Sequence, residues 1–197
     1  MANLTPQGAE TSVVAGSPKL PATVDQAPAQ YLTFQFGGEL FALGILNVKE
    51  IIEYGTITEI PMMPAFIRGV LNLRGAVVPV IDLSARFGGV PTATGRRTCI
   101  VIIEMIQTAE GSEVRQDIGL VVDCVNEVLE IPASDIEPPP AFGAKIRADF
   151  IQGMGKVAGK FVIILSAERV LSVEEMSTLS QLSGQTGNSI EEGSAAR

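Results

Sequence analysis

The sequence predicts a mainly β fold: two small five-stranded β-barrels packed together, with short helices and a C-terminal helix. Three observations lead to this fold class. Short runs rich in Val, Ile and Thr follow one another along the chain, signals for helices are sparse, and the plan of one half recurs in the other. Closing about five strands into a barrel would remove the open edges that otherwise recruit other chains.

A β-hairpin is the first predicted element. Residues 31–36 alternate between apolar and polar side chains, as expected for a strand with one buried face. Gly37-Gly38 then supplies a tight turn into a second strand over residues 39–43.

More strands and one helix are predicted after the hairpin. Ser172, with Glu175 three residues later, forms a capping box, which predicts a short terminal helix on the surface. The remaining strands are expected over residues 56–60, 70–73, 76–82, 97–106, 117–122, 127–131 and 161–165.

The internal repeat divides these strands into two units. Phe66-Ile67-Arg68-Gly69 recurs as Phe150-Ile151-Gln152-Gly153, and each copy is followed by a second glycine and then by a strand. Val48-Lys49-Glu50 recurs in the same way as Val125-Asn126-Glu127. Each unit is therefore expected to contain a hairpin, a Val-x-Glu segment, a two-glycine turn and a closing strand.

Both ends of the chain differ in composition from its centre. Residues 1–29 carry four prolines among small and polar residues, so they are predicted to be a disordered leader. Residues 183–197, rich in Gly, Ser and Glu, are predicted to be a disordered tail. The domain between them is expected over 30–180, with the first barrel at about 30–95, the second at about 96–160, and the closing strand and helix at 161–182.

Composition excludes several functions. The chain has no His, which excludes Ser-His-Asp and Cys-His catalytic groups and any His-ligated metal. Its net charge of -8 argues against nucleic acid or an anionic membrane as the main partner. No run of residues approaches the length of a membrane span, and the N-terminus lacks the order of a signal peptide, so a cytoplasmic protein is expected. No catalytic residue, metal site or cofactor is predicted.

Two glycine- and proline-rich segments are interpreted as structural. Gly153–Gly159 precedes a strand and lacks the spacing of a phosphate-binding loop, so a turn is favoured. Pro138-Pro139-Pro140 could bind a proline-recognition groove, but a stiff connector is the favoured interpretation. Carboxylates are plentiful, so a small enzyme with an acidic site between the barrels stays open as an alternative.

The most distinctive segment is Asn72–Leu83, which has the pattern N-L-R-G-x-V-x-P-V-x-D-L. Pro79 lacks an N–H group, which predicts that this strand lies at the margin of its barrel, where a partner could bind. Arg74 offers a planar fork of donors, and Glu50 supplies the opposite charge from another repeated segment.

These charges permit a second interpretation. Arg74, Asp82 and Arg86 could instead form ion pairs within the molecule. The residues alone do not decide between a partner-binding surface and internal ion pairs.

Landmarks along the whole body resemble the CheW family of chemotaxis coupling proteins. The resemblance covers residues 31–179 and follows the family's order. Its landmarks are Phe36–Leu43, Val48–Ile51, Pro64–Val70, Asn72–Gly75, Val80–Leu83, Gly119–Asp123 and Phe150–Gly155.

The resemblance implies a noncatalytic adaptor made of two five-stranded barrels. Members bridge the cytoplasmic tip of methyl-accepting chemotaxis receptors to the regulatory domain of the histidine kinase CheA. Receptor contact in the family falls in a groove beside the N-L-R-G and V-x-E segments, which here implies Val48, Glu50, Arg74 and Gly75. It also implies a cytoplasmic protein recruited to receptor clusters.

Kinase contact in the family uses apolar barrel surface, which here implies exposed side chains such as Ile57 and Ile60. In some members a second kinase contact uses a basic residue and an aromatic one in a loop that here contains Phe142. Glu137 in that loop reverses the expected charge. An adaptor of another receptor–kinase pathway, such as surface motility, fits the same resemblance.

Overall fold

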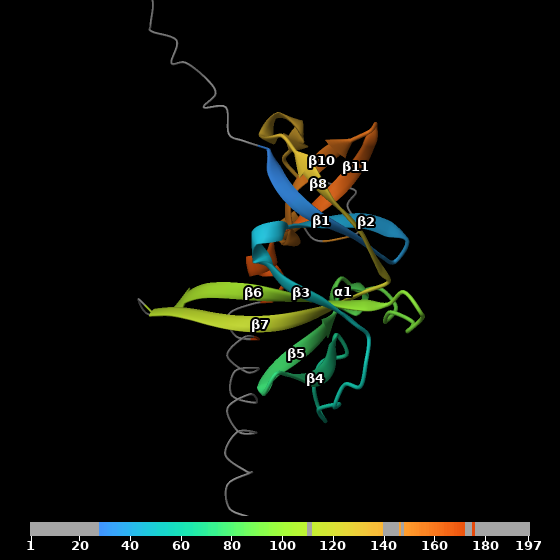
Figure 1. The fold of residues 1–197 in the computed structure, drawn as a ribbon, viewed down its shortest axis with the longest axis vertical. Coiled ribbons are helices and arrows are strands. Elements are labelled where there is room, and N and C mark those ends of the chain that lie inside the picture. The colour runs from blue at the N-terminus through green and yellow to red at the C-terminus, as the bar shows by residue number, and fades with distance from the viewer. Residues whose placement is uncertain (1–27, 110–111, 140–145, 147, 172–174, 176–197) are drawn as a thin grey trace, which may run out of the picture.

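The computed structural model describes residues 28–109, 112–139, 146, 148–171 and 175, and within them the chain folds into two β-sheets (Figure 1). One sheet has six strands in the order β8-β1-β2-β11-β10-β9, and the other has five in the order β3-β6-β7-β5-β4. The prediction of a mainly β fold is confirmed. The strands are β1 (Ala29–Phe36), β2 (Glu39–Gly44), β3 (Val48–Glu53), β4 (Ile67–Leu73), β5 (Ala76–Asp82), β6 (Cys99–Ala109), β7 (Ser112–Val122), β8 (Cys124–Ile131), β9 (Ile136–Glu137), β10 (Ile151–Val157) and β11 (Lys160–Leu165).

Short helical turns connect the strands. Helix α1 (Leu83–Arg86) directly follows β5, and Asp82 caps its first turn. The 3₁₀ turns are η1 (Ile45–Asn47), η2 (Ala133–Asp135), η3 (Ala148–Phe150) and η4 (Ala167–Arg169). Of the predicted C-terminal helix only Glu175 is described, so that prediction lies outside the described residues.

The β1–β2 hairpin forms as the sequence predicts. Phe36 pairs with Glu39 across a loop of two glycines, and Gly37 and Gly38 have φ angles of +58° and +80°. Both angles lie in the region that glycine adopts without strain, so this turn has the conformation that hairpins favour.

The sheets do not divide the chain at residue 95, as the proposed barrel boundaries required. Strands β1 and β2 belong to the six-stranded sheet with β8–β11, whereas β6 and β7 belong to the five-stranded sheet with β3–β5. The first hairpin of each repeat therefore joins the sheet that contains the remaining strands of the other repeat. Two parallel pairs, β5–β7 and β2–β11, and two antiparallel pairs, β1–β8 and β3–β6, make this exchange. Each of them joins strands that are not adjacent in sequence.

The five-stranded sheet curls until its two edges meet. Thr58, in the segment after β3, makes an isolated bridge to Val70 of β4, with backbone hydrogen bonds of 2.8 and 2.9 Å. A strand was predicted over 56–60, and this bridge is what forms there. The prediction of two five-stranded barrels is thus right in part: one sheet has six strands, and continuous strand pairing closes neither sheet within the described residues.

Pro79 does not mark an edge, because β5 lies between β7 and β4. Val70, opposite Pro79, directs both backbone groups to Thr58 instead. The Val70–Pro79 position is therefore one without hydrogen bonds in the antiparallel pair, and the parallel pairing with β7 begins only at Val80. The missing N–H of Pro79 consequently leaves no gap in either ladder.

Strand β10 was not predicted, because its glycines resemble a turn. A Cβ atom on Gly153 would lie 2.7 Å from Ile136 Cγ2, and one on Gly155 would lie 2.9 Å from Ile131 Cδ1. These glycines therefore permit close packing inside a strand. The turn itself is Ala158-Gly159, with φ angles of +49° and +75°.

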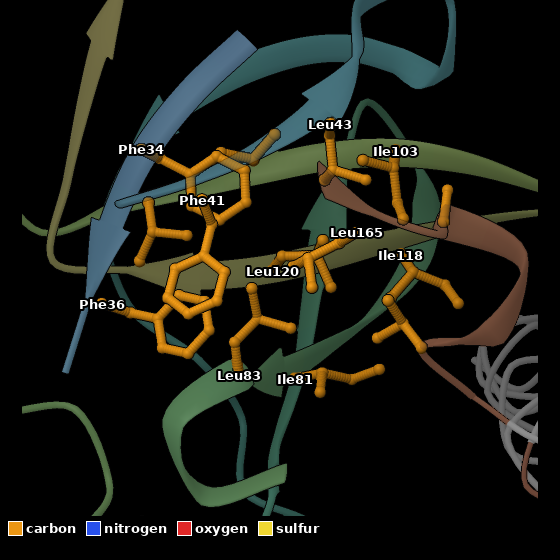
Figure 2. Packing of buried hydrophobic residues seen from close by; sticks show 14 of the residues in the cluster. Phe34, Phe36, Phe41, Leu43, Ile81, Leu83, Ile103, Ile118, Leu120 and Leu165 are labelled. Carbon is orange, nitrogen blue, oxygen red and sulfur yellow. The ribbon is translucent and has the colours of Figure 1, made fainter. Parts of the chain in front are cut away.

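A continuous apolar core fills the space between the two sheets (Figure 2). Stacked aromatic rings from β1 and β2 form one side of it, and the Phe36 and Phe41 ring centroids lie 3.8 Å apart. The five-stranded sheet covers the opposite side. Its fully buried contributions are Ile81, Val101, Ile103, Met105, Ile118, Leu120 and Val122.

Candidate partner-binding surface

The surface that the sequence pointed to is built on the turn between β4 and β5. Leu73 pairs with Ala76 across Arg74-Gly75, whose φ angles are +53° and +94°. The side chain of Asn72 accepts a hydrogen bond of 2.8 Å from the Gly75 N–H. This turn fixes the backbone of Arg74, and the Arg74 side chain is 81% exposed.

Glu50 of β3 meets this turn. Arg74 Nη2 donates a hydrogen bond to Glu50 Oε2 at 3.1 Å. Strands β3 and β4 are at opposite ends of the sheet order, so only the curl of the sheet brings the two residues together. The pair thus combines an exposed cation with a carboxylate side chain that is 27% exposed.

Two further predicted receptor-contact residues lie beside this pair. Gly75 is exposed, directly next to Arg74 in the turn. Val48 is half-buried at the start of β3 and packs against the main core. The structure therefore brings Glu50, Arg74 and Gly75 together at one place, and Val48 lies on the same strand as Glu50 with its side chain turned partly inward.

Ion pairs within the molecule, the other interpretation of these charges, also form. Asp82 pairs with Arg68 at 2.8 Å, and Arg86 Nη2 pairs with Glu175 Oε2 at 2.8 Å. Both pairs are more buried than the Glu50–Arg74 pair, since their arginine side chains are only 27% and 15% exposed. Asp82 and Arg86 consequently have structural roles, whereas Arg74 faces solvent.

The predicted kinase-contact residues are less exposed than expected. Ile57 is half-buried and packs against the cluster inside the curled sheet, which contains Leu71 and Val80. Ile60 is also half-buried. Their exposure was predicted wrongly, because the segment after β3 folds back onto β4. Phe142 lies outside the described residues.

Glu137 has a partner of its own. Lys156 Nζ donates to Glu137 Oε1 at 2.6 Å, and the same nitrogen lies 5.9 Å from the ring centroid of Phe161. Phe161 is 55% exposed. The charge that departs from the family pattern is therefore held in an ion pair between β9 and β10.

The structure supplies few features of a catalytic site. No group of three or more Cys, Asp or Glu side chains that could hold a metal occurs in the part of the chain that the structure describes. The space between the sheets, where an acidic site was considered, is filled by the hydrophobic core. In the same described part, no helix is long and apolar enough to cross a membrane.

Among the residues placed by the structure, two groups have shifted pKa values, and both belong to the framework. Hydrogen bonds from Lys49 to Asp117 and then to Glu104 raise the pKa of Lys49. Burial raises the pKa of Tyr31. Within the described residues, neither group makes a hydrogen bond or ion pair with Glu50 or Arg74, so the shifts mark structural positions.

Comparisons with known proteins agree on one family. The family described as "CheW-like domain" matches residues 30–175. "Chemotaxis protein CheW" of Klebsiella aerogenes is 34% identical over 147 residues, covering 75% of this chain and 84% of that protein. "Protein FrzA" of Myxococcus xanthus is 32% identical over 130 residues, covering 66% of this chain and 76% of that protein.

A solved structure gives the same result. The chain resembles the crystal structure of scaffolding protein TtCheW from Thermoanaerobacter tengcongensis, with a TM-score of 0.66 and 35% identity. The match covers 80% of this chain and 96% of the other. With the family match spanning both sheets, the chain belongs to the CheW family of noncatalytic chemotaxis scaffold proteins.

Proposed function

We propose that this protein couples methyl-accepting chemotaxis receptors to the histidine kinase CheA, as a cytoplasmic adaptor recruited to receptor clusters. The observation that carries the proposal is the Glu50–Arg74 pair, an exposed arginine held on a rigid turn beside a carboxylate. The pair comes from the V-x-E and N-L-R-G segments, which form the receptor-contact groove in the family.

The chemistry of the pair suits a helical receptor tip. A helix presents apolar and charged side chains at regular spacing, and an Arg and a Glu at the rim of a surface can fix its register. Val48, Glu50, Arg74 and Gly75 are the proposed receptor-contact residues. The planar guanidinium of Arg74 can bind a receptor carboxylate with two parallel hydrogen bonds.

The kinase contact is proposed at the end of the curled sheet, around Ile57 and Ile60, with Phe142 in a second contact. Ile57 would stabilise the backbone of this contact segment, since its side chain packs against the cluster inside the curled sheet. The fully exposed Met62 of the same segment offers apolar surface, beside the half-buried Ile60. Binding of both partners would then couple their energies, and a coupling of about 1–3 kcal/mol changes an equilibrium several-fold or more.

Reconstitution tests the adaptor function. Purified protein titrated into receptor-containing membranes with CheA is expected to raise the rate of kinase autophosphorylation. The control omits the receptors, which removes the partner that the adaptor should connect. An unchanged rate over the whole titration would contradict the proposal.

Substitution of Arg74 tests the receptor surface. Arg74→Asp is expected to weaken receptor binding by more than about 1 kcal/mol, because it replaces the donor with a like charge beside Glu50. The melting temperature should change little, since the Arg74 side chain is 81% exposed. Arg115→Asp is a matched control, because Arg115 is also exposed, at 59%, and lies in β7, where it pairs with Glu104 and Glu113.

The melting temperature and the control variant distinguish a loss of receptor contact from a folding defect or a general charge effect. If Arg74→Asp lowers the melting temperature strongly, Arg74 acts mainly as a structural ion-pair partner. If both variants weaken receptor binding equally, the effect comes from net charge and not from this surface.

A second candidate function keeps the fold and changes the pathway. One relative carries another name, "Protein FrzA" of Myxococcus xanthus, so an adaptor in a different receptor–kinase system, such as one for surface motility, is the alternative. Pull-down with a chemotaxis receptor fragment and CheA distinguishes the two. Binding to neither partner would favour the alternative pathway.

A further inference from the structure

A second surface lies away from the Glu50–Arg74 pair, in the loop between α1 and β6. The loop contains Arg96-Arg97, the one place in the whole sequence where two basic residues are adjacent. In Figure 1 this green loop projects from the same end of the molecule as the blue β1–β2 turn. A hollow of about 500 Å³ lies here, lined by the loop together with Gly37 of the β1–β2 turn, Ser84 of α1 and Asp123 between β7 and β8.

The loop is held rigidly around Asp82, a carboxylate with no exposed surface. Asp82 accepts hydrogen bonds from the Thr92 N–H at 2.8 Å and from the Thr92 hydroxyl at 3.2 Å. The Ser84 hydroxyl donates to the Val90 carbonyl at 2.6 Å. The first part of the loop is thereby fixed to α1 and to the end of β5.

A closed turn presents the two arginines. Thr98 N–H donates to the Gly95 carbonyl at 3.1 Å, and Gly95 N–H donates to the Thr98 hydroxyl at 2.8 Å. Arg96 and Arg97 occupy the two central positions of this turn and are exposed. Because the turn is already formed, binding there would cost little ordering of the backbone.

These two cations differ from most other basic residues in the part of the chain that the structure describes. Ion pairs within the molecule hold Lys49, Arg68, Arg74, Arg86, Arg115 and Lys156. The side chains of Arg96 and Arg97 make no hydrogen bond or ion pair with any residue that the structure describes. In a chain with a net charge of -8, two adjacent cations left without internal partners favour an acidic ligand.

The rest of the lining favours a polypeptide over a simple anion. Val90 is 82% exposed and offers apolar contact at the edge of the hollow. Asp123 lines the same hollow and can accept N–H groups, which a phosphate or a nucleic-acid backbone does not provide. Donors, an acceptor and an apolar side chain together match a peptide that carries carboxylates beside an apolar residue.

We propose that the hollow lined by Val90, Arg96, Arg97 and Asp123 docks an acidic segment of a partner protein. Carboxylates of the segment pair with Arg96 and Arg97, and an apolar side chain of the segment covers Val90. This surface lies apart from the Glu50–Arg74 pair, so the inference does not depend on the proposed receptor contact.

An NMR titration of the full-length, ¹⁵N-labelled protein tests the proposal. The probe is a synthetic peptide with the sequence Asp-Glu-Leu-Asp-Glu, acetylated and amidated at its ends. Amide shifts are expected in residues 88–98 and at Asp123, with a dissociation constant of about 1 mM or tighter. A peptide in which Lys replaces every acidic residue should cause no shifts there.

Two double variants separate the site from general charge. Arg96→Glu with Arg97→Glu should weaken binding of the acidic peptide by about tenfold or more. Lys160→Glu with Arg169→Glu makes the same change in net charge at exposed residues elsewhere and should change affinity less than about twofold. Melting temperatures of both variants check that the fold is intact.

Four outcomes would overturn the proposal. One is the absence of shifts with the wild-type protein, and another is an equal loss of affinity in both double variants. The third is preferential binding of a short single-stranded DNA, which would make the hollow a general polyanion site. A control adds unlabelled protein, without peptide, to the labelled protein. If the same loop shifts appear there, a second copy of this chain occupies the hollow, and this result would also contradict the proposal.

Discussion

Asp82 illustrates how one side chain can organise a surface without contacting a partner. Its carboxylate caps α1 through the Ala85 N–H at 3.1 Å and holds Thr92 through two hydrogen bonds. It also accepts one hydrogen bond from Arg68 Nε at 2.9 Å and forms an ion pair with Arg68 Nη2 at 2.8 Å. The positions of α1, Thr92 and Arg68 therefore depend on the carboxylate of Asp82. A buried ion pair of this kind is costly to break, because the remaining partner keeps an uncompensated charge.

Replacement of Asp82 by Asn tests this dependence. Asp82→Asn keeps the shape but removes the charge, and it should lower the free energy of unfolding by about 2–4 kcal/mol. Urea denaturation measures the change as a shift of the midpoint at constant slope. Arg115→Gln, which breaks only exposed ion pairs, should cost less than about 1 kcal/mol, and equal costs for the two variants would contradict this account.

At the scale of elements, the curl of the five-stranded sheet depends on a glycine. Gly69 has a φ angle of +135°, and a Cβ atom there would lie 2.1 Å from the Thr58 carbonyl oxygen. Thr58 is the residue that bridges to Val70. A side chain at residue 69 would therefore push apart the two edges that bring Glu50 to Arg74.

Two glycine substitutions separate this packing effect from backbone strain. Gly69→Ala should destabilise the protein by about 3 kcal/mol or more, because the clash is with backbone atoms. Gly75→Ala, also at positive φ but with open space around it, should cost only about 1 kcal/mol. Thermal unfolding compares the two, and similar losses would mean that strain, not the clash, decides the effect.

At the scale of the whole molecule, Arg86 connects the two sheets to the C-terminal segment. Its guanidinium lies 4.5 Å from the ring centroid of Phe66 and 5.2 Å from that of Phe150. Arg86 also donates to the Val170 carbonyl at 2.9 Å and pairs with Glu175. Residues of both repeats, Phe66 in the first and Phe150 and Val170 in the second, thus share one cation.

Removal of this cation should loosen the C-terminal segment first. Arg86→Gln is expected to lower the free energy of unfolding by about 2–3 kcal/mol, since it removes an ion pair and two cation–π contacts. Hydrogen exchange should become faster in residues 167–171 than in β6 and β7. Uniform acceleration over all strands would show that the loss is global and that Arg86 does not act as a local connection.

The pH dependence of stability is also a property of the whole chain. The sequence has no His, so no side chain has its ordinary titration between about pH 6 and 8, and stability should be nearly constant in that interval. Tyr31 and Lys49 have pKa values raised above 10.0 and 10.5. A raised folded-state pKa means that the folded form holds its proton more tightly, so stability should fall only at pH values above about 10.

Urea denaturation at several pH values measures this profile. In Tyr54→Phe, which leaves Tyr31 as the remaining tyrosine, ultraviolet absorbance should follow the ionisation of one phenol above its ordinary pKa of 10.0. A marked loss of stability between about pH 6 and 8 would contradict the expected profile.

Local patterns in the sequence predicted the first hairpin and pointed to the charged residues of the candidate binding surface. Alternation and the Gly37-Gly38 pair are sufficient for the first hairpin. The repeat matched Gly69–Gly75 with Gly153–Gly159 as turns, but only the last two residues of each segment, Arg74-Gly75 and Ala158-Gly159, form the turn. Arg74 and Glu50 could be chosen as candidates because their residue types and segments are visible in the chain. These features depend on neighbours in sequence, so they need no knowledge of the fold.

Which strands pair, and therefore which charges meet, was decided only by tertiary structure. The exchange of hairpins, the internal position of Pro79 and the close packing at Gly153 all depend on contacts between residues distant in sequence. The same holds for Ile57, which looked exposed and packs inward, and for Arg96-Arg97, whose lack of internal partners no pattern could reveal. The sequence by itself determined the β class, the turns and the family, because these reside in local residue types. Strand partners and side-chain exposure followed only from the fold, because parallel pairing and the curl of a sheet join segments that have no local signal for each other.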